Sequence, residues 1–149
     1  MLGETIGKQS VPVKNTVERG AVKKFAEAIG DLAPIYYDEE AGKNSRYKRN
    51  IAPPTFPVTL DYGIIPELAL PAKGLIHGEQ LYHYKRPLFV GEDVYCHTEV
   101  KDYYEKTGNH GDMGFLVIIR YGVDANDDLI FTEERVIIIN EAVRKGMLV

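Results

Sequence analysis

The chain has 149 residues, of which 44% are hydrophobic and 27% are charged, and its formal net charge at pH 7 is −4. This length predicts one domain, residues 1–149, which can fold without a metal ion or a disulfide. The acidic balance argues against a nucleic-acid-binding protein, and aliphatic runs such as Leu116–Ile119 are far too short to cross a bilayer.

The first predicted element is an amphipathic helix. A stripe of apolar residues with helical spacing runs along it: Val17, Ala21, Val22, Phe25, Ala26 and Ile29. Asn15 and Glu18 have the spacing of a capping box, in which each side chain bonds the other's backbone amide. Gly30 tolerates the left-handed conformation and is placed to end the helix. Asp31 is therefore expected just past the helix end, in a turn that Pro34 makes rigid.

The next segment is predicted to be short helices separated by breaks. Asp38 can cap a second short helix over about residues 39–45. The residues before Pro54 cannot form regular structure. Pro54 or Pro57 is placed to begin a further helix that runs towards Ile65.

The second half of the chain reads as strands. Apolar runs and alternating patterns predict strands over residues 75–86, 94–100, 115–123 and 129–140. Turns are expected at residues 108–111 and 124–128, which are rich in Gly, Asn and Asp. Helices that gather first and antiparallel strands that follow predict an α+β fold, with one sheet covered on one face.

The cysteine content and the first residues suggest the compartment. Cys96 is the single cysteine, so no internal disulfide can form. The segment Met1–Thr5 shows no basic stretch followed by an apolar run, which is the pattern of a secretory signal. We therefore expect a cytoplasmic protein that is not attached to a membrane.

Short motifs occur in a fixed order along nearly the whole chain: Phe25–Asp31, Pro34–Asp38, Ala52–Phe56, His77–Gln80, Arg86–Leu88 and Gly91–Asp93. In this order they make the chain similar to the MaoC-like dehydratase family, and more narrowly to its N-terminal-type branch. The resemblance implies a hot-dog fold, in which an antiparallel sheet wraps around a long helix. It also implies a dimer whose sheets join edge to edge and acyl tunnels near the subunit boundary.

The family's (R)-specific hydratases carry the pattern Asp-x-x-x-x-His after the first helix, and the resemblance places Asp31 at the aspartate. Tyr36 stands where the histidine is expected. Hydration of an enoyl thioester needs a base for water and an acid for the α-carbon, work that two neighbouring titratable groups can share. A phenol titrates near 10 and an imidazole near 6.5, so a basic Tyr36 costs roughly 5 kcal/mol more. His77 is the candidate that could supply the missing imidazole. Asp31 could also be an ordinary turn residue that bonds its own backbone.

The same resemblance suggests how a thioester would be bound. Tyr37, Pro54, Thr55 and Phe56 are candidate tunnel-lining residues. A basic loop that includes Arg46, Lys48 and Arg49 could bind the phosphates of coenzyme A or the acidic surface of an acyl carrier protein, or it could be a solvated face. No zinc-ligand spacing is present, so neither a metal nor a cofactor is expected beyond the carrier of the substrate.

Three functions remain open. The first is the reversible dehydration and hydration of (3R)-hydroxyacyl and trans-2-enoyl thioesters, with Asp31 handling the proton of the water. The second is a non-catalytic, tunnel-forming subunit of a heteromeric dehydratase, which the replacement of histidine by Tyr36 favours. The third is a hot-dog thioesterase, which rests on the analogy of the fold alone. The chain is accordingly expected to form a homodimer or a heterodimer with another hot-dog subunit.

Overall fold

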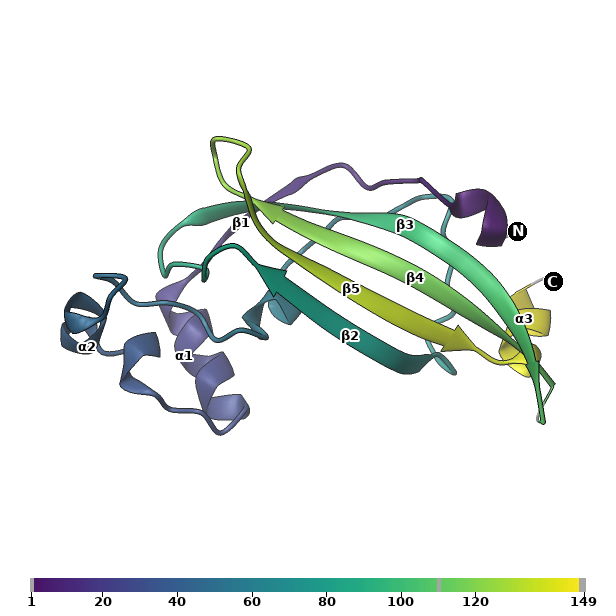
Figure 1. Cartoon of the computed structure of the whole chain (residues 1–149), viewed down its shortest axis with the longest axis horizontal. Coiled ribbons are helices and arrows are strands. Elements are labelled where there is room, and N and C mark those ends of the chain that lie inside the picture. The colour runs from purple at the N-terminus through teal and green to yellow at the C-terminus, as the bar shows by residue number, and fades with distance from the viewer. Residues whose placement is uncertain (1, 110, 148–149) are drawn as a thin grey trace.

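The computed structural model describes residues 2–109 and 111–147, and an antiparallel sheet dominates this part of the chain (Figure 1). Within these residues the sheet has five strands in the order β1-β3-β4-β5-β2. The strands are β1 (Val13–Thr16), β2 (Ile76–Tyr84), β3 (Asp93–Gly108), β4 (Gly111–Val123) and β5 (Leu129–Ile139). The long strands β3, β4 and β5 follow one another as a meander, which leaves the short β1 and the longer β2 at the two edges.

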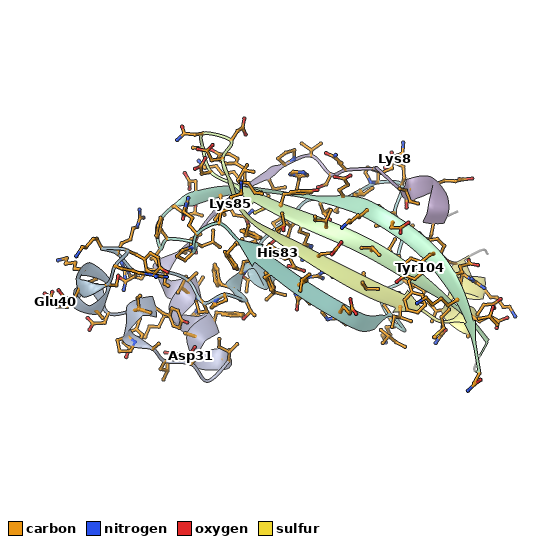
Figure 2. All side chains as sticks on the ribbon, in the orientation of Figure 1. Lys8, Asp31, Glu40, His83, Lys85 and Tyr104 are labelled. Carbon is orange, nitrogen blue, oxygen red and sulfur yellow. The ribbon has the colours of Figure 1, made fainter. Side chains whose placement is uncertain are left out.

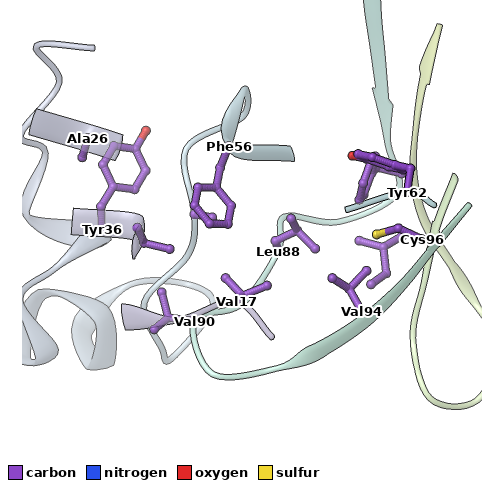
Figure 3. Packing of buried hydrophobic residues seen from close by; sticks show 13 residues of the cluster. Val17, Ala26, Tyr36, Phe56, Tyr62, Leu88, Val90, Val94 and Cys96 are labelled. Atoms are coloured by element: carbon purple, nitrogen blue, oxygen red, sulfur yellow. The ribbon is translucent and has the colours of Figure 1, made fainter. Parts of the chain in front are cut away.

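The segment between helix α2 (Glu39–Asn44) and strand β2 crosses one face of the sheet, which we call the inner face. Tyr84 Oη donates a 2.6 Å hydrogen bond to Pro54 O, and Tyr84 packs on Phe131 of the neighbouring strand. The buried residues at the end of the sheet nearest residues 19–44 form one apolar cluster (Figure 3): Val17, Val22, Ala26, Tyr36, Ala52, Phe56, Tyr62, Leu88, Val90, Val94, Cys96, Ile130 and Phe131. A second buried cluster around Ile65, Leu116 and Ile118 covers the other end of the inner face.

The helices are short and lie mostly at the ends of the sheet. The α-helices are α1 (Arg19–Ala28), α2 (Glu39–Asn44) and α3 (Glu141–Met147), and the 3₁₀ turns are η1 (Leu2–Thr5), η2 (Pro34–Tyr36) and η3 (Phe56–Thr59). Helix α1, with ten residues, is the longest one in the described ranges. Helices α1 and α2 form an arm beyond one end of the sheet, and α3 lies at the opposite end (Figure 1). None of the helices in the described ranges is long and apolar enough to span a lipid bilayer.

The predicted α+β class is confirmed, and so are the first two helices and the four strands of the second half. The Asp38 side chain accepts a hydrogen bond from the Glu40 N–H and caps α2, as predicted. Val22 and Ala26 are fully buried, whereas Ile29, at the end of the same stripe, is exposed. The periodicity of apolar residues in the sequence therefore predicts most of the helices and strands of the fold.

The capping box at Asn15 is wrong. Asn15 lies in β1, a strand the sequence did not reveal, and Glu18 precedes α1 without a side-chain capping bond. Asn15 Nδ2 donates to Asp61 O at 2.8 Å, and Asn15 Oδ1 accepts from Asp61 N at 2.9 Å. This two-bond pairing with a distant backbone replaces the local cap, because one amide side chain satisfies two main-chain groups at once.

The helix predicted from Pro54 or Pro57 to Ile65 is also wrong, because only η3 forms there. Tyr62 Oη donates to Pro57 O at 2.7 Å, and Tyr62 O accepts from Ser10 Oγ at 2.6 Å. These two hydrogen bonds fix the segment in a non-helical conformation against the inner face. The C-terminal α3 was not predicted either. The turn expected at residues 108–111 includes His110, which lies outside the described residues.

Candidate functional site

Asp31 stands in a tight turn that begins where α1 ends. Gly30 has a φ of +73°, so the chain reverses there in a conformation that glycine adopts without strain. The Asp31 N–H then donates to Ala26 O at 2.9 Å, which closes the helix end. Asp31 Oδ1 accepts from the Ala33 N–H at 3.3 Å. The turn fixes the position of the carboxylate, and the side chain stays exposed at the tip of the arm (Figure 2).

Tyr36 is the group that contacts this carboxylate. Its side chain is 8% exposed and belongs to the buried cluster beside α1, while its hydroxyl donates to Asp31 Oδ2 at 3.5 Å. Burial of the phenol, followed by the negative charge of Asp31 and the hydrogen bond to it, raises the pKa of Tyr36 above its usual value. Tyr36 therefore remains a protonated donor through the neutral range and is not a base.

Three exposed apolar side chains lie close to Asp31 in the sequence. Ile29, Leu32 and Tyr37 are all exposed large side chains within six residues of Asp31 along the chain. The sequence suggested that Tyr37 is a tunnel wall, and the structure places it on the open surface of the arm.

The candidate tunnel residues after α2 divide into two groups. Phe56 is buried and packs edge to face on Phe25, with ring centroids 5.6 Å apart. Pro54 and Thr55 are exposed. The Phe56 N–H already donates to Pro53 O, and in the described chain the Thr55 N–H has no hydrogen-bond acceptor. Thr55 therefore offers the backbone amide of this stretch that could meet a ligand oxygen.

The cationic side chains of the basic loop after α2 are exposed. Arg46 Nη2 donates to its neighbour Tyr47 Oη, and Arg49 Nη2 donates to Val90 O at 3.2 Å. The Arg49 guanidinium also lies 4.5 Å from the centre of the Phe89 ring. Among the described side chains, no carboxylate pairs with Arg46, Lys48 or Arg49. Their charges are thus available to an anionic ligand.

His77 lies away from this group. It is the second residue of β2, its ring nitrogen Nε2 is 3.0 Å from Glu79 O, and the side chain is exposed. Tyr84, at the other end of the same strand, packs against the cluster that contains Tyr36. At about 3.3 Å per residue, the two ends of β2 are separated by roughly 23 Å. The structure therefore brings Asp31 and Tyr36 together and places His77 elsewhere in the chain.

A buried ionic cluster on the inner face was not predicted. Glu133 is 0% exposed, Arg135 Nε donates to its Oε1 at 2.6 Å, and Arg120 Nη1 lies 3.9 Å from its Oε2. The Arg120 guanidinium also stacks 4.4 Å from the Tyr62 ring centre. Burial and then the charge of Glu133 raise the pKa of Tyr82, the strand neighbour, to about 12. Three consecutive charged residues, Glu133–Arg135, interrupt the apolar strand β5, but the sequence did not show which of them face the inner side of the sheet.

A cavity lies beside α3, at the end of the sheet opposite the arm that carries Asp31 (Figure 1). It has a volume of about 510 Å³ and is lined by η1, by α3 and by Tyr103 and Glu105 of β3. No group of His, Cys, Asp and Glu side chains within the described ranges could hold a metal ion.

Comparison with solved structures places this architecture among hot-dog folds. The chain is similar to a C-terminally truncated HadBC (3R-hydroxyacyl-ACP dehydratase) complex from Mycobacterium tuberculosis, with a TM-score of 0.74 and 16% identity over 93% of this chain and 99% of that chain. It is also similar to an (R)-hydratase from A. caviae, with a TM-score of 0.70 and 22% identity over 91% of this chain and 96% of that chain. The predicted hot-dog fold is confirmed, although the long helix expected within the sheet is here the ten-residue α1, which lies beyond one end of the sheet.

Sequence comparison then gives the family. Residues 4–133 match the model of the FAS1-like dehydratase domain region. The chain is also 38% identical over 105 residues to a UPF0336 protein of Thermobifida fusca, an alignment that covers 66% of this chain and 69% of that protein. The chain belongs to the FAS1-like dehydratase domain family, and the predicted resemblance to MaoC-like dehydratases is confirmed at the level of the fold.

Proposed function

We propose that this protein hydrates trans-2-enoyl thioesters and dehydrates the corresponding (3R)-hydroxyacyl thioesters, with Asp31 as the catalytic residue. The observation that carries the proposal is the Asp31 carboxylate, held in a fixed turn by the Ala33 N–H and contacted by the Tyr36 hydroxyl. Membership of a dehydratase family supports it. We also propose a cytoplasmic location, in keeping with the single buried cysteine Cys96.

In the hydration direction, Asp31 accepts a proton from water while the water oxygen forms a bond to C3 of the enoyl group. The double-bond electrons move towards C2 and the thioester carbonyl, and C2 then takes a proton. Asp31, protonated in the first step, is the group placed to return that proton. In the dehydration direction, Asp31 removes the proton from C2 and delivers it to the C3 hydroxyl. The C3–O bond breaks, water leaves and the C2–C3 double bond forms.

The other residues have supporting roles in this proposal. Tyr36 is a positioning residue, because its hydroxyl donates to Asp31 and its raised pKa keeps it protonated. The Thr55 N–H is proposed to donate to the thioester oxygen, where negative charge develops. Tyr37 and Pro54 would contact the acyl group. Phe56, which is buried, would act by holding this wall in place.

The carrier of the thioester would meet the basic loop. Arg46, Lys48 and Arg49 are exposed and have no carboxylate partner in the described part of the chain, so they can approach the phosphates of coenzyme A or of a phosphopantetheine arm. No step is assigned to His77, because it lies at the opposite end of β2.

The test is the hydration of crotonyl-CoA by the purified chain, followed through the loss of enoyl absorbance. The Asp31→Asn variant should lose at least about a hundredfold of this rate, which is the typical contribution of a general acid–base group. Asp38→Asn is the matched control, because Asp38 caps α2 and lies outside the proposed site. Equal rates for the wild type and Asp31→Asn would refute the assignment. Release of free thiol without hydration would instead identify a thioesterase.

A second candidate is a tunnel-forming subunit that works with another hot-dog chain. The specific observation in its favour is that the side chain in contact with Asp31 is a phenol with a raised pKa, and that no histidine among the described residues bonds to Asp31. The similar HadBC structure is, by its description, a complex of a (3R)-hydroxyacyl-ACP dehydratase. This candidate predicts that the chain alone is inactive and that activity appears only after a partner with an intact Asp-x-x-x-x-His pair is added.

A further inference from the structure

Asn50 is a buried polar residue that the proposed reaction does not use. It follows the basic loop directly in the sequence and is 4% exposed. Its Nδ2 donates to Ile35 O and to Asp38 O, at 2.8 Å each, and its Oδ1 accepts from Arg19 Nη1 at 3.0 Å. Both N–H groups and the oxygen of the amide are therefore hydrogen-bonded, as the burial of an amide requires.

These hydrogen bonds join separate parts of the arm. Arg19 begins α1, Ile35 belongs to η2, and Asp38 is the residue that caps α2. Ile35 and Asp38 lie on either side of Tyr36 in the sequence, so the Asn50 amide fixes the main chain both before and after Tyr36. The amide thus holds the loop from which the Tyr36 hydroxyl reaches the catalytic carboxylate.

The main chain of Asn50 is attached to the segment between β2 and β3. The Val90 N–H donates to Asn50 O at 3.0 Å, and the Ala52 N–H donates to Leu88 O at 2.8 Å. The Arg49 side chain of the basic loop is held on the same segment, because it donates to Val90 O. None of these bonds involves the Asn50 side chain. A substitution of that side chain therefore frees the arm while the basic loop keeps its attachment.

Helix α2 approaches the Asn50 amide closely because residue 42 is a glycine. A Cβ at Gly42 would lie 2.7 Å from Asn50 Nδ2 and 2.8 Å from Asn50 N, which is closer than a Cβ atom approaches a non-bonded neighbour in folded proteins. The Gly42 N–H donates to Asp38 O at 3.0 Å, so the same carbonyl accepts from Gly42 and from Asn50. The close approach allows α2 and Asn50 to share this acceptor.

We propose that Asn50 is a positioning residue for the Asp31–Tyr36 pair and acts through the main chain of Ile35 and Asp38. The proposal rests on the hydration reaction assigned above for its kinetic test, although the bonds that define it are structural. Without the amide, the loop loses the anchor on both sides of Tyr36 and its hydroxyl leaves Asp31. A small displacement of reacting groups lowers a rate steeply.

The kinetic test uses two variants of Asn50. Asn50→Ala removes all the side-chain bonds, whereas Asn50→Asp keeps the size and the acceptor for Arg19 and removes both donors. Each variant should lower kcat for the hydration of crotonyl-CoA by about tenfold. KM should stay within about twofold of the wild-type value, because the basic loop keeps its backbone attachment. A wild-type kcat in Asn50→Asp overturns the proposal.

Asn15→Ala is the matched control. Asn15 also joins two distant segments, through hydrogen bonds to both main-chain groups of Asp61, but it lies in β1 and not in the arm. Its loss should reduce stability without lowering kcat. All rates are compared under conditions in which circular dichroism shows each variant to be folded. A similar loss of kcat in Asn15→Ala and Asn50→Ala would mean a general loss of stability and overturns the proposal.

A double-mutant cycle tests whether Asn50 acts through Tyr36. Tyr36→Phe should lower kcat a few-fold in the wild type, but by less than about twofold in the Asn50→Ala background, since residues that act as one unit are not additive. In the Asn15→Ala background the full effect of Tyr36→Phe should persist. Equal effects of Tyr36→Phe in all three backgrounds overturn the proposal.

Hydrogen exchange of residues 31–38 gives a readout that needs no activity. In Asn50→Ala the amides of this segment should exchange at least about tenfold faster than in Asn15→Ala, because their anchor is lost. Gly42→Ala, whose new Cβ strikes Asn50, should change the exchange in the same direction. Unchanged exchange in Asn50→Ala overturns the proposal. Faster exchange in Asn50→Ala with a wild type that does not hydrate crotonyl-CoA supports the anchoring of the loop and refutes only the reaction assigned to Asp31.

Discussion

Removal of the buried carboxylate Glu133 is predicted to destabilise the fold strongly. Glu133 is fully buried between Arg120 and Arg135, and the Arg135 side chain makes a charge-assisted bond of 2.6 Å to it. The Glu133→Gln variant keeps the shape and removes the charge, which leaves two largely buried guanidinium groups without a counter-ion. Burial and the neighbouring Arg135 already lower the pKa of Arg120.

The expected loss follows from this geometry. Breaking a buried ion pair by removing one partner costs about 3–5 kcal/mol, because the remaining charge is left uncompensated. The free energy of unfolding, measured by urea titration at one protein concentration, should fall by that amount. Glu134→Gln is the matched control, since the neighbouring Glu134 pairs with exposed Lys101 and should change stability little. A Glu133→Gln variant as stable as Glu134→Gln would refute the reasoning.

Three further predictions address the site and the packing. Tyr36→Phe removes a weak hydrogen bond of 3.5 Å, so it should lower the rate of hydration only a few-fold. In the wild type, the pH–rate profile should show no phenol ionisation below pH 10, because the pKa of Tyr36 is raised. Gly122→Ala should cost about 1–3 kcal/mol in urea titrations, because its Cβ would strike the Phe131 ring, whereas Gly20→Ala, in open space on α1, should be neutral or stabilising. Arg46→Glu should raise KM for crotonyl-CoA several-fold at low salt, with kcat unchanged and a smaller effect at high salt.

The strands could be predicted because their signal is local. The alternation from Val94 to Val100 and the apolar runs of β4 and β5 depend only on which face is buried. The short strand β1 could not be found in this way. Asn15 of this strand is a residue type that commonly caps helices, but its side chain bonds to the backbone of Asp61, which is distant in the sequence. The local sequence around Asn15 is compatible with a helix cap and with a strand, and the long-range hydrogen bonds to Asp61 favour the strand.

The same limit applies to the site. The turn at Gly30 and Asp31 was predictable, because a helix stop and an acidic residue follow an apolar stripe. The contact between Asp31 and Tyr36 is consistent with their spacing across η2. The burial of Glu133 could not be predicted, since Ile130 and Phe131, side by side in the sequence, are both buried and obscure the inner face.

The most direct test of the central claim is a crystal structure of the protein with an unreactive enoyl-CoA analogue bound. We expect C3 of the acyl group, or a water molecule in contact with it, to lie about 3–3.5 Å from the Asp31 carboxylate, with the coenzyme phosphates near the basic loop. An analogue seated in the cavity beside Tyr103, or elsewhere away from Asp31, would contradict the account.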